Sequence, residues 1–563
     1  MSILRQPVRP LFAAALLVLA PAAWPQLGSV GGYQKISPAT GGFVGAITDS
    51  DELAYSMCPL GDLDGDGVPD LAVGAPWDDD GGTDRGAVWV LFLKADGTVK
   101  TQQKISDTLG GFTGVLNDAD WFGWSLAPIG DLDNDGVVDL AVGALQTDDI
   151  GMDTGAVWIL FLNANGTVKS SSQIKSLSGG LGYFLDFTWF GTSIAPLGDF
   201  DGDGVEDIAV GAHGDSDTGT FVGAVHVLYL NTNGTVKSHA KINEITGGFT
   251  GALDDGDEFG WSLANLGDMD GNGAVDLAVG AELDDDGGQD RGAVWILFLK
   301  KAGDLVAGQQ KISATSGGFT GVLDNKDHFA RSLASFGDFD GDGTGDLVVG
   351  AQQDDDGGSN MGAVWEIFLN PDGTVASHQK ISALEGGFTG ALDLEDNLGS
   401  SVATLGDVNG DGLPDLAVGA SQDDDGGLDT GAVWVMFLDG GTWVGLGFAL
   451  AGTAGLPQLS GTGTLQPASA GSLDLTSAKP NALSILFVSL FNNPVPFKGG
   501  FLVPVPSLIE LPFVTGGAGT IPIGFIWPVG VPSGTTVYFQ YAIQDAAAIK
   551  GVALSNALSG TTP

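Results

Sequence analysis

The chain has 563 residues, of which 70 are Asp or Glu and only 21 are Lys or Arg, so its formal net charge is −49. This balance excludes proteins that bind nucleic acid or dock on anionic membranes, because both need basic patches. The length is sufficient for two or three domains with a substantial core.

The first 23 residues have the features of a secretory signal peptide. Arg5 and Arg9 precede an apolar run over residues 11–20, and Ala20-Pro21-Ala22 supplies the small residues of a cleavage site. The run is too short to span a bilayer comfortably, and no later segment of the mature chain offers a clean span. We therefore expect a protein that is secreted or held at the cell surface.

Residues 30–440 repeat one unit six times. Each unit contains a nine-residue acidic loop, and the first loop reads DLDGDGVPD from Asp62 to Asp70. A fixed period of about 69 residues predicts a repeat architecture. The six loops begin at Asp62, Asp131, Asp199, Asp268, Asp338 and Asp407.

The loops have the composition of calcium sites. Carboxylates at alternate positions converge on one point, as a cation with six to eight oxygen ligands requires. We predict side-chain ligands at loop positions one, three, five and nine, and a carbonyl ligand at position seven. Position six is Gly in every loop, which indicates a left-handed backbone. An EF-hand is excluded, because Val73 and its five equivalents stand where that motif has Glu.

The predicted ligands would hold about six structural Ca²⁺ ions. They are Asp62, Asp64, Asp66, Val68 and Asp70; Asp131, Asp133, Asp135, Val137 and Asp139; Asp199, Asp201, Asp203, Val205 and Asp207; Asp268, Asp270, Asn272, Ala274 and Asp276; Asp338, Asp340, Asp342, Thr344 and Asp346; and Asp407, Asn409, Asp411, Leu413 and Asp415.

Short apolar stretches predict four β-strands in each unit. Two strands flank the acidic loop, and two flank a hairpin turn such as Asp96-Gly97. Four-stranded antiparallel sheets repeated around an axis form a β-propeller. One Gln-Lys-Ile-Ser strand, at residues 34–37, precedes the first loop, whereas the sixth unit lacks this strand at its end. Pairing between the two would close six blades; the alternative is a seventh blade built from residues 441–455.

A second acidic cluster follows the loop in four units, as in Asp78-Asp79-Asp80. Because the cluster recurs with the same Gly-Gly after it, we interpret it as a solvated turn or an auxiliary cation site rather than as an acid/base pair.

The C-terminal residues 446–563 differ from the repeats. Charged residues are rare there, and Pro, Gly, Ser and Thr separate short apolar runs. This pattern predicts a second all-β domain resembling a sandwich, without a metal motif or a catalytic pair.

The third unit departs most from the others, and asymmetry is a pointer to a ligand site. It is rich in aromatic residues, and we predict a ligand-binding role for Tyr183, Phe187 and Trp189, whose rings suit stacking on sugars or peptides. The alternative interpretation is that these residues belong to the core.

Phe122-Gly123 before the loop and Gly74-Ala75-Pro76 after it resemble the FG-GAP repeat of integrin alpha chains and of many exported bacterial proteins. The resemblance implies an all-β fold, a six-bladed FG-GAP β-propeller (alternatively seven-bladed), here followed by the small sandwich-like domain. It also implies calcium in the loops and a propeller surface that meets extracellular partners. The units are not uniform: the first has Leu53-Ala54 and the sixth Leu398-Gly399 in place of Phe-Gly.

The expected function is a non-catalytic adhesion or ligand-binding module at the cell surface or in the extracellular space. Its partner would be an extracellular protein or polysaccharide. The alternatives are a structural scaffold of the cell envelope or matrix, or an accessory domain of an extracellular hydrolase or lyase. Integrin signalling and heterodimerisation are not expected, because no integrin-like transmembrane segment or leg domain follows the repeats.

Overall fold

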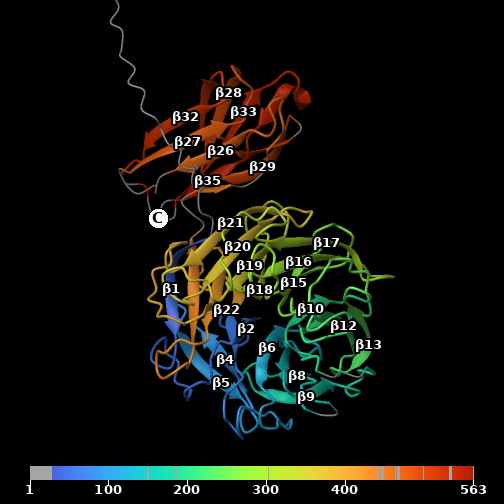
Figure 1. Cartoon of the computed structure of the whole chain (residues 1–563). Coiled ribbons are helices and arrows are strands. Elements are labelled where there is room, and N and C mark those ends of the chain that lie inside the picture. The colour runs from blue at the N-terminus through green and yellow to red at the C-terminus, as the bar shows by residue number, and fades with distance from the viewer. Residues whose placement is uncertain are drawn as a thin grey trace, which may run out of the picture.

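The computed structural model describes residues 28–561, apart from 149–150, 184, 186, 302, 440–442, 446–448, 463–464, 466–468, 499, 530 and 532–534. The signal peptide predicted over residues 1–23 lies outside this range. Every regular element in the described residues is a β-strand, except the short 3₁₀ helix η1 (Ile549–Gly551). The chain is therefore an all-β protein (Figure 1).

Six four-stranded antiparallel sheets form the larger part of the molecule, and we call them blades 1 to 6. Their strands are β2 (Ser56–Gly61), β3 (Asp70–Ala75), β4 (Ala87–Leu93) and β5 (Val99–Ile105) in blade 1; β6 (Phe122–Pro128), β7 (Leu140–Ala144), β8 (Ala156–Leu162) and β9 (Val168–Lys175) in blade 2; β10 (Ile194–Gly198), β11 (Asp207–Ala212), β12 (Ala224–Leu230) and β13 (Val236–Ile242) in blade 3; β14 (Leu263–Gly267), β15 (Asp276–Ala281), β16 (Ala293–Leu299) and β17 (Val306–Ser313) in blade 4; β18 (Phe329–Gly337), β19 (Asp346–Ala351), β20 (Ala363–Leu369) and β21 (Val375–Ser382) in blade 5; and β22 (Leu398–Gly406), β23 (Asp415–Ala420), β24 (Ala432–Asp439) and β1 (Ser29–Ile36) in blade 6.

The blades form a ring around a central axis. The first strand of each blade contacts the first strands of both neighbouring blades, from β2 through β6, β10, β14 and β18 to β22 and back to β2. Figure 1 shows the labelled first strands near the centre of the ring and β5, β9, β13, β17 and β21 toward its outside. The six-bladed propeller predicted from the sequence is confirmed.

The strand sequences explain this arrangement. The second and third strands are continuous apolar runs, DLAVGA and AVWVLFL in blade 1, and both are buried along their whole length. Such runs suit strands that are covered on both faces. Neighbouring blades supply the cover: Val90 of β4 shares one apolar cluster with Trp158 of β8.

The ring closes through its two chain ends. Strand β1 pairs antiparallel with β24, which places Lys35 opposite Trp434 and Gln34 opposite Val435. The N-terminal Gln-Lys-Ile-Ser copy thus completes the last blade, as its position in the sequence predicted. This pairing covers the edge of β24 and makes β1 the outermost strand of blade 6, as β5 is in blade 1.

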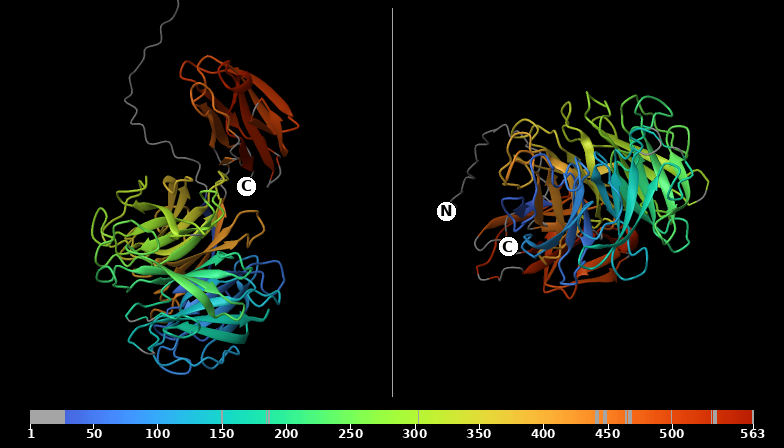
Figure 2. Two further views of the ribbon diagram at one scale, coloured as in Figure 1. Left: turned by 90° about the vertical axis from the view of Figure 1, so that its right-hand side faces the viewer. Right: turned by 90° about the horizontal axis from the view of Figure 1, so that it is seen from below.

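The C-terminal strands form three further sheets, which Figure 2 shows as a group beside the blades. They are β25 (Trp443–Gly445), β26 (Gln458–Thr462), β27 (Ala470–Thr476), β28 (Leu483–Ser489), β29 (Asn492–Phe497), β30 (Gly500–Pro504), β31 (Ile509–Val514), β32 (Ile521–Ile526), β33 (Thr536–Gln544), β34 (Val552–Leu554) and β35 (Leu558–Thr561).

Two of these sheets share an apolar core. Leu475 of β27 and Tyr541 of β33 lie in one cluster, as expected of a sandwich-like unit. The alternative of a seventh blade is wrong, because β25 pairs with β35 and Leu450 bridges to Leu554, so residues 443–445 and 450 belong to the C-terminal sheets. The domain boundary at residue 446 stays a prediction.

Across the described ranges, the structure contains no helix that is long and apolar enough to cross a membrane.

Candidate metal centres and axial pocket

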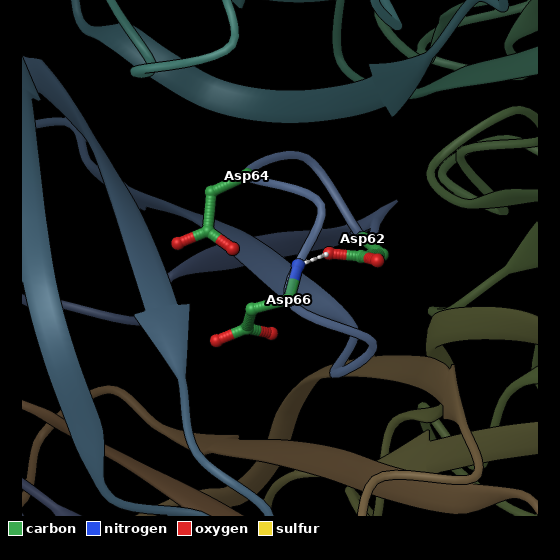
Figure 3. Close-up of side chains that lie close together, drawn as sticks. All are labelled: Asp62, Asp64 and Asp66. Atoms are coloured by element: carbon green, nitrogen blue, oxygen red, sulfur yellow. Dashed lines mark hydrogen bonds between the residues drawn. The ribbon is translucent and has the colours of Figure 1, made fainter.

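Each acidic loop joins the first and second strands of its blade and is held by its own backbone. In the first loop, the carboxylate of Asp62 accepts hydrogen bonds from the backbone N–H groups of Asp66 and Gly67, both at 2.8 Å. Gly67 has φ +92°, the left-handed backbone expected at position six. The side chains of Asp62, Asp64 and Asp66 therefore all project from the same tight turn (Figure 3).

The ninth loop residue ties the loop to the blade. Asp70 is buried, and its carboxylate accepts hydrogen bonds from the backbone N–H groups of Leu63 and Leu93, each at 3.0 Å. Burial raises the pKa of Asp70 to about 6. Leu93 ends β4, so this one carboxylate joins the loop to the third strand of the sheet.

Five of the six loops bring three carboxylates together, with one oxygen from each residue within 4.8 Å of the others. This donor set fits a hard cation that takes oxygen ligands. Among the described residues the sixth loop makes no such group, because Asn409 stands at position three and its Nδ2 donates to Asp411 at 2.8 Å. The converging groups are Asp62, Asp64 and Asp66; Asp131, Asp133 and Asp139; Asp199, Asp201 and Asp203; Asp268, Asp270 and Asp276; and Asp338, Asp340 and Asp346.

Lysines of the outer strands reach three of these loops. Lys100 Nζ lies 2.7 Å from Asp64 Oδ2 and also contacts Asp66. Lys169 pairs in the same way with the second loop, and Lys237 with the third. The equivalent residues beside loops four and five are Ala307 and Ala376, so these five loops fall into two electrostatic classes.

The second acidic clusters are not simple solvated turns. In blade 1, Lys104 of β5 reaches back to Asp78 and Asp80 with Nζ–O distances of 2.7 Å, and its ammonium group lies over the Trp89 ring at 5.3 Å. Asp78 is only 2% exposed. The lysine of the Gln-Lys-Ile-Ser strand therefore supplies the positive charge at this cluster. Blades 4, 5 and 6 repeat the arrangement with Lys311, Lys380 and Lys35.

In the third blade, one residue of the aromatic stretch compensates for a tryptophan that the blade lacks. His226 replaces the tryptophan of the third strand, and the Tyr183 ring packs against it at 5.6 Å, with Lys241 Nζ 5.8 Å from the tyrosine ring. Tyr183 therefore fills the position that tryptophan has in other blades. Phe184, part of the same stretch, lies outside the described residues.

Trp189 and Phe187 occupy different surroundings from Tyr183. Trp189 stacks on His213 at 4.8 Å, and His213 in turn contacts Trp261 of blade 4 at 4.7 Å. Phe187 is 43% exposed. Trp189 thus lies close to the residues that surround the axis. The ligand-binding role predicted for Tyr183, Phe187 and Trp189 stays a prediction.

The axis itself carries the least repetitive part of the molecule. The residue after each Phe-Gly pair, or its equivalent, lines a small axial cavity of about 90 Å³. While the strands repeat six times, this position holds five different residue types, and only blades 2 and 4 share one, a tryptophan. In chain order the six residues are Tyr55, Trp124, Thr192, Trp261, Arg331 and Ser400.

Arg331 is the only cation in that set. It is 8% exposed, and its guanidinium carbon lies 4.9 Å from the Tyr55 ring and 4.8 Å from the Trp261 ring. Its Nη1 is 3.9 Å from Oε2 of buried Glu282. Burial raises the pKa of Glu282 to about 8, and the charge of Arg331 opposes this shift.

A larger pocket of about 250 Å³ lies beside Arg331. Tyr55 and Trp77 supply aromatic surface, and most of the remaining lining is polar. Amide side chains dominate the polar wall, and two carboxylates complete it. These residues are Gln352, Gln353, Asn360, Asn397, Gln422, Glu52 and Glu395.

Sequence reasoning did not find this pocket. Its residues come from blades 1, 5 and 6, and each stands at a position where the unit varies. Two variable positions in the unit could have indicated the pocket: the residue after Phe-Gly and the two residues after Gly-Ala.

Comparison with known proteins agrees with the repeat count. A family model described as the FG-GAP repeat matches six times, at residues 54–91, 122–160, 190–228, 259–297, 330–367 and 398–436. Each match covers the first strand, the acidic loop, the second strand and most of the third strand of one blade.

The chain is also similar to curated integrin alpha chains. It is 34% identical over 243 residues to integrin alpha-V of Gallus gallus, which is 42% of this chain and 20% of that protein. It is 33% identical over 244 residues to integrin alpha-PS2 of Drosophila melanogaster, 42% of this chain and 16% of the relative. With integrin alpha-4 of Xenopus laevis it shares 37% identity over 151 residues, 27% and 13% of the two chains. The matches thus span a fifth or less of these relatives, and the chain is an integrin alpha-like FG-GAP repeat protein.

Proposed function

We propose that this chain is an exported, non-catalytic adhesion or ligand-binding module that acts at the cell surface or in the extracellular space. The observation that carries the proposal is the asymmetry at the axis. Loops, strands and hairpins repeat in all six blades, but the axial residues change from Tyr55 and Trp124 to Arg331 and Ser400. Repeated features serve the architecture, whereas a ligand needs one asymmetric place.

We further propose that the acidic loops hold about six structural Ca²⁺ ions through loop positions one, three, five, seven and nine. The proposal is supported by the convergence of three carboxylates in five loops. Bound calcium would neutralise these carboxylates and fix each loop between its two strands.

The expected partner is an extracellular protein or polysaccharide. Export is supported by the signal-like residues 1–23, and a binding role by the similarity to chains named integrins. A scaffold of the cell envelope or matrix is the second candidate, because the acidic surface and the repeated blades would suit self-assembly through calcium as well.

The test is binding of the labelled mature chain to a panel of extracellular polysaccharides, matrix proteins and cell envelopes, in calcium and in chelator. Saturable binding to one class, lost in chelator, is the expected result. Calcium-dependent self-association without binding to any panel member would favour the scaffold. Catalytic turnover of a panel member would overturn the non-catalytic assignment.

A further inference from the structure

Most acidic loops offset one of their negative charges within the chain itself. In the first loop, Lys100 Nζ contacts the carboxylates of Asp64 and Asp66, at positions three and five. Lys169 and Lys237 do the same in the second and third loops. An ammonium group between two carboxylates offsets the repulsion between them.

The fourth and sixth loops reach the same balance by a different route. Asn272 stands at position five of the fourth loop, and Asn409 at position three of the sixth, where other loops have Asp. The Nδ2 of Asn272 donates to the Leu299 carbonyl and that of Asn409 to Asp411, both at 2.8 Å. Each of these loops therefore has three carboxylates, not four, at its side-chain ligand positions.

The fifth loop does neither. It has Asp at all four side-chain ligand positions, and Ala376 stands at the strand position from which Lys100 reaches the first loop. The lysine of this blade, Lys380, pairs instead with the second acidic cluster at Asp354 and Asp356. Within the described residues, the fifth loop is thus the one loop whose ligand carboxylates have neither a lysine nor an asparagine among them. The four are Asp338, Asp340, Asp342 and Asp346.

Blade 5 also has an acidic residue in its interior. Glu366 of β20 stands where the other five blades have Val or Ile, and it is fully buried. Neither of its carboxyl oxygens has a hydrogen-bond partner in the described part of the chain. Burial raises the pKa of Glu366 well above its ordinary value, and the negative charge of Asp346 raises it further. A cation at the fifth loop would reduce this unfavourable interaction as well as the repulsion within the loop.

One strand joins the fifth loop to the axis. β18 carries Arg331, whose guanidinium carbon lies 4.9 Å from the Tyr55 ring and 4.8 Å from the Trp261 ring, and it ends directly before Asp338. Only residues 332–337 separate Arg331 from the loop. Opening of the loop would therefore free the strand that positions Arg331.

We propose that the fifth loop is a calcium-controlled switch in the ring: Ca²⁺ bound there orders β18 and holds Arg331 at the axis, whereas the other five loops change less when calcium is removed. The inference rests on the proposed calcium sites and adds which of them responds most to calcium and what that site moves. In the calcium-free protein, local opening begins at this loop, because its four carboxylates repel one another without compensation.

Hydrogen–deuterium exchange of the full mature chain, in calcium and in chelator, tests the switch. Residues 329–351 span β18, the fifth loop and β19. They should exchange at least about tenfold faster in chelator than in calcium. The corresponding segments of the other blades should change by less than about twofold.

Two substitutions copy what other loops already have. Ala376→Lys supplies the lysine of blade 1, and Asp342→Asn supplies the asparagine of the fourth loop. Each should slow the exchange of residues 329–351 in chelator toward the rate in calcium. Ser377→Lys is the matched control, because it adds the same charge at the next exposed residue, on the opposite face of the strand, and it should keep the wild-type response.

Each other outcome has a definite meaning. If all six loops respond equally to chelator, the switch is wrong while the calcium sites stand. If residues 329–351 respond but Ala376→Lys and Asp342→Asn exchange in chelator like the wild type, uncompensated charge is not the cause and the inference is overturned. If no segment responds and the melting temperature is the same in calcium and in chelator, the calcium assignment fails together with the inference.

Discussion

Lys35 and Asp423 join the two ends of the propeller. Lys35 lies on β1 at the start of the described chain and Asp423 follows β23 in the sixth unit, yet their Nζ and Oδ2 atoms are 2.5 Å apart. Asp423 is 1% exposed, and the lysine lies over the Trp434 ring at 5.0 Å. This ion pair adds a side-chain contact to the backbone pairing of β1 with β24 that closes the ring.

Removal of one partner should destabilise the closing blade. Lys35→Ala leaves Asp423 buried without its cation, and we expect a loss of about 3 kcal/mol in the free energy of unfolding. Chemical denaturation in saturating calcium would measure this loss.

Blade 2 supplies the compensating change. It has Gln173 where blade 6 has Lys35, and Thr147 where blade 6 has Asp423. The double variant Lys35→Gln with Asp423→Thr should therefore recover most of the lost stability. A double variant no more stable than Lys35→Ala would show that the ion pair itself, not the burial of an unpaired charge, determines the stability of the closing blade.

Stability should fall as pH rises because of Glu282. Burial raises the folded-state pKa of this carboxyl to about 8, whereas an unfolded glutamate titrates near about 4.3. Between these values the folded protein holds a proton that the unfolded chain has lost. Glu282 therefore stabilises the fold most at acid pH, and this contribution disappears as pH rises from about 4.5 to 8, at about 1.4 kcal/mol per pKa unit.

Glu282→Gln should flatten the fall in melting temperature between pH 5 and 8, measured in constant calcium. Glu52 and Glu258, with pKa values of about 7, change stability in the same direction, so part of the slope will remain. Arg331 and His328 face the same group. Glu510→Gln, at an exposed site in the C-terminal sheets, is the control and should keep the wild-type slope. An unchanged slope in Glu282→Gln would contradict the prediction.

The sequence predicted what each unit dictates locally. The acidic loop, its left-handed glycine and the Asp-Gly hairpin each depend on residues close together in the chain, and all appear in the structure. Ring closure was also predictable, because one strand was missing at the end of the sixth unit and present before the first. Six copies of the same pattern made each of these assignments stronger than a single copy would allow.

Contacts between distant positions were not predictable in the same way. Lys104 reaches Asp78 only because β5 folds back along the blade, so the acidic cluster looked like a solvated turn. The axial pocket combines Tyr55 and Trp77 with Gln353 and Asn397, residues of three blades that no local pattern connects. Tyr183 stood out as an aromatic residue, but its relationship to His226 required the register of β12.

The lysines beside the first three loops should weaken calcium binding there. Lys100, Lys169 and Lys237 place an ammonium group against loop carboxylates, which lowers the attraction for a divalent cation. Because these lysines are exposed to solvent, which screens their charge, we expect Lys100→Ala to tighten calcium binding at the first loop by about tenfold or less.

Calorimetric titration of the calcium-free protein would detect the change. The wild type should show a tighter and a weaker class of sites, and the triple alanine variant should move the weaker class toward the tighter one. Lys94→Ala is the control, since this lysine belongs to the same blade but bonds to Thr98 in the hairpin. Identical isotherms for wild type and triple variant would show that the lysines leave the loops when the cation binds.

Calcium removal should lower the melting temperature. Without a cation, the loop carboxylates repel one another, and a cation that binds only the folded state at one hundred times its Kd adds about 2.7 kcal/mol per site. Asp338→Asn with Asp340→Asn should lower the melting temperature in calcium and have no such effect in chelator, because it removes two converging carboxylates of the fifth loop. Asp372→Asn is a matched control: Asp372 lies in a hairpin turn where other units have Asn165 and Asn233, so it should melt like the wild type in both conditions. A wild-type melting temperature that is the same in calcium and in chelator would contradict the calcium assignment.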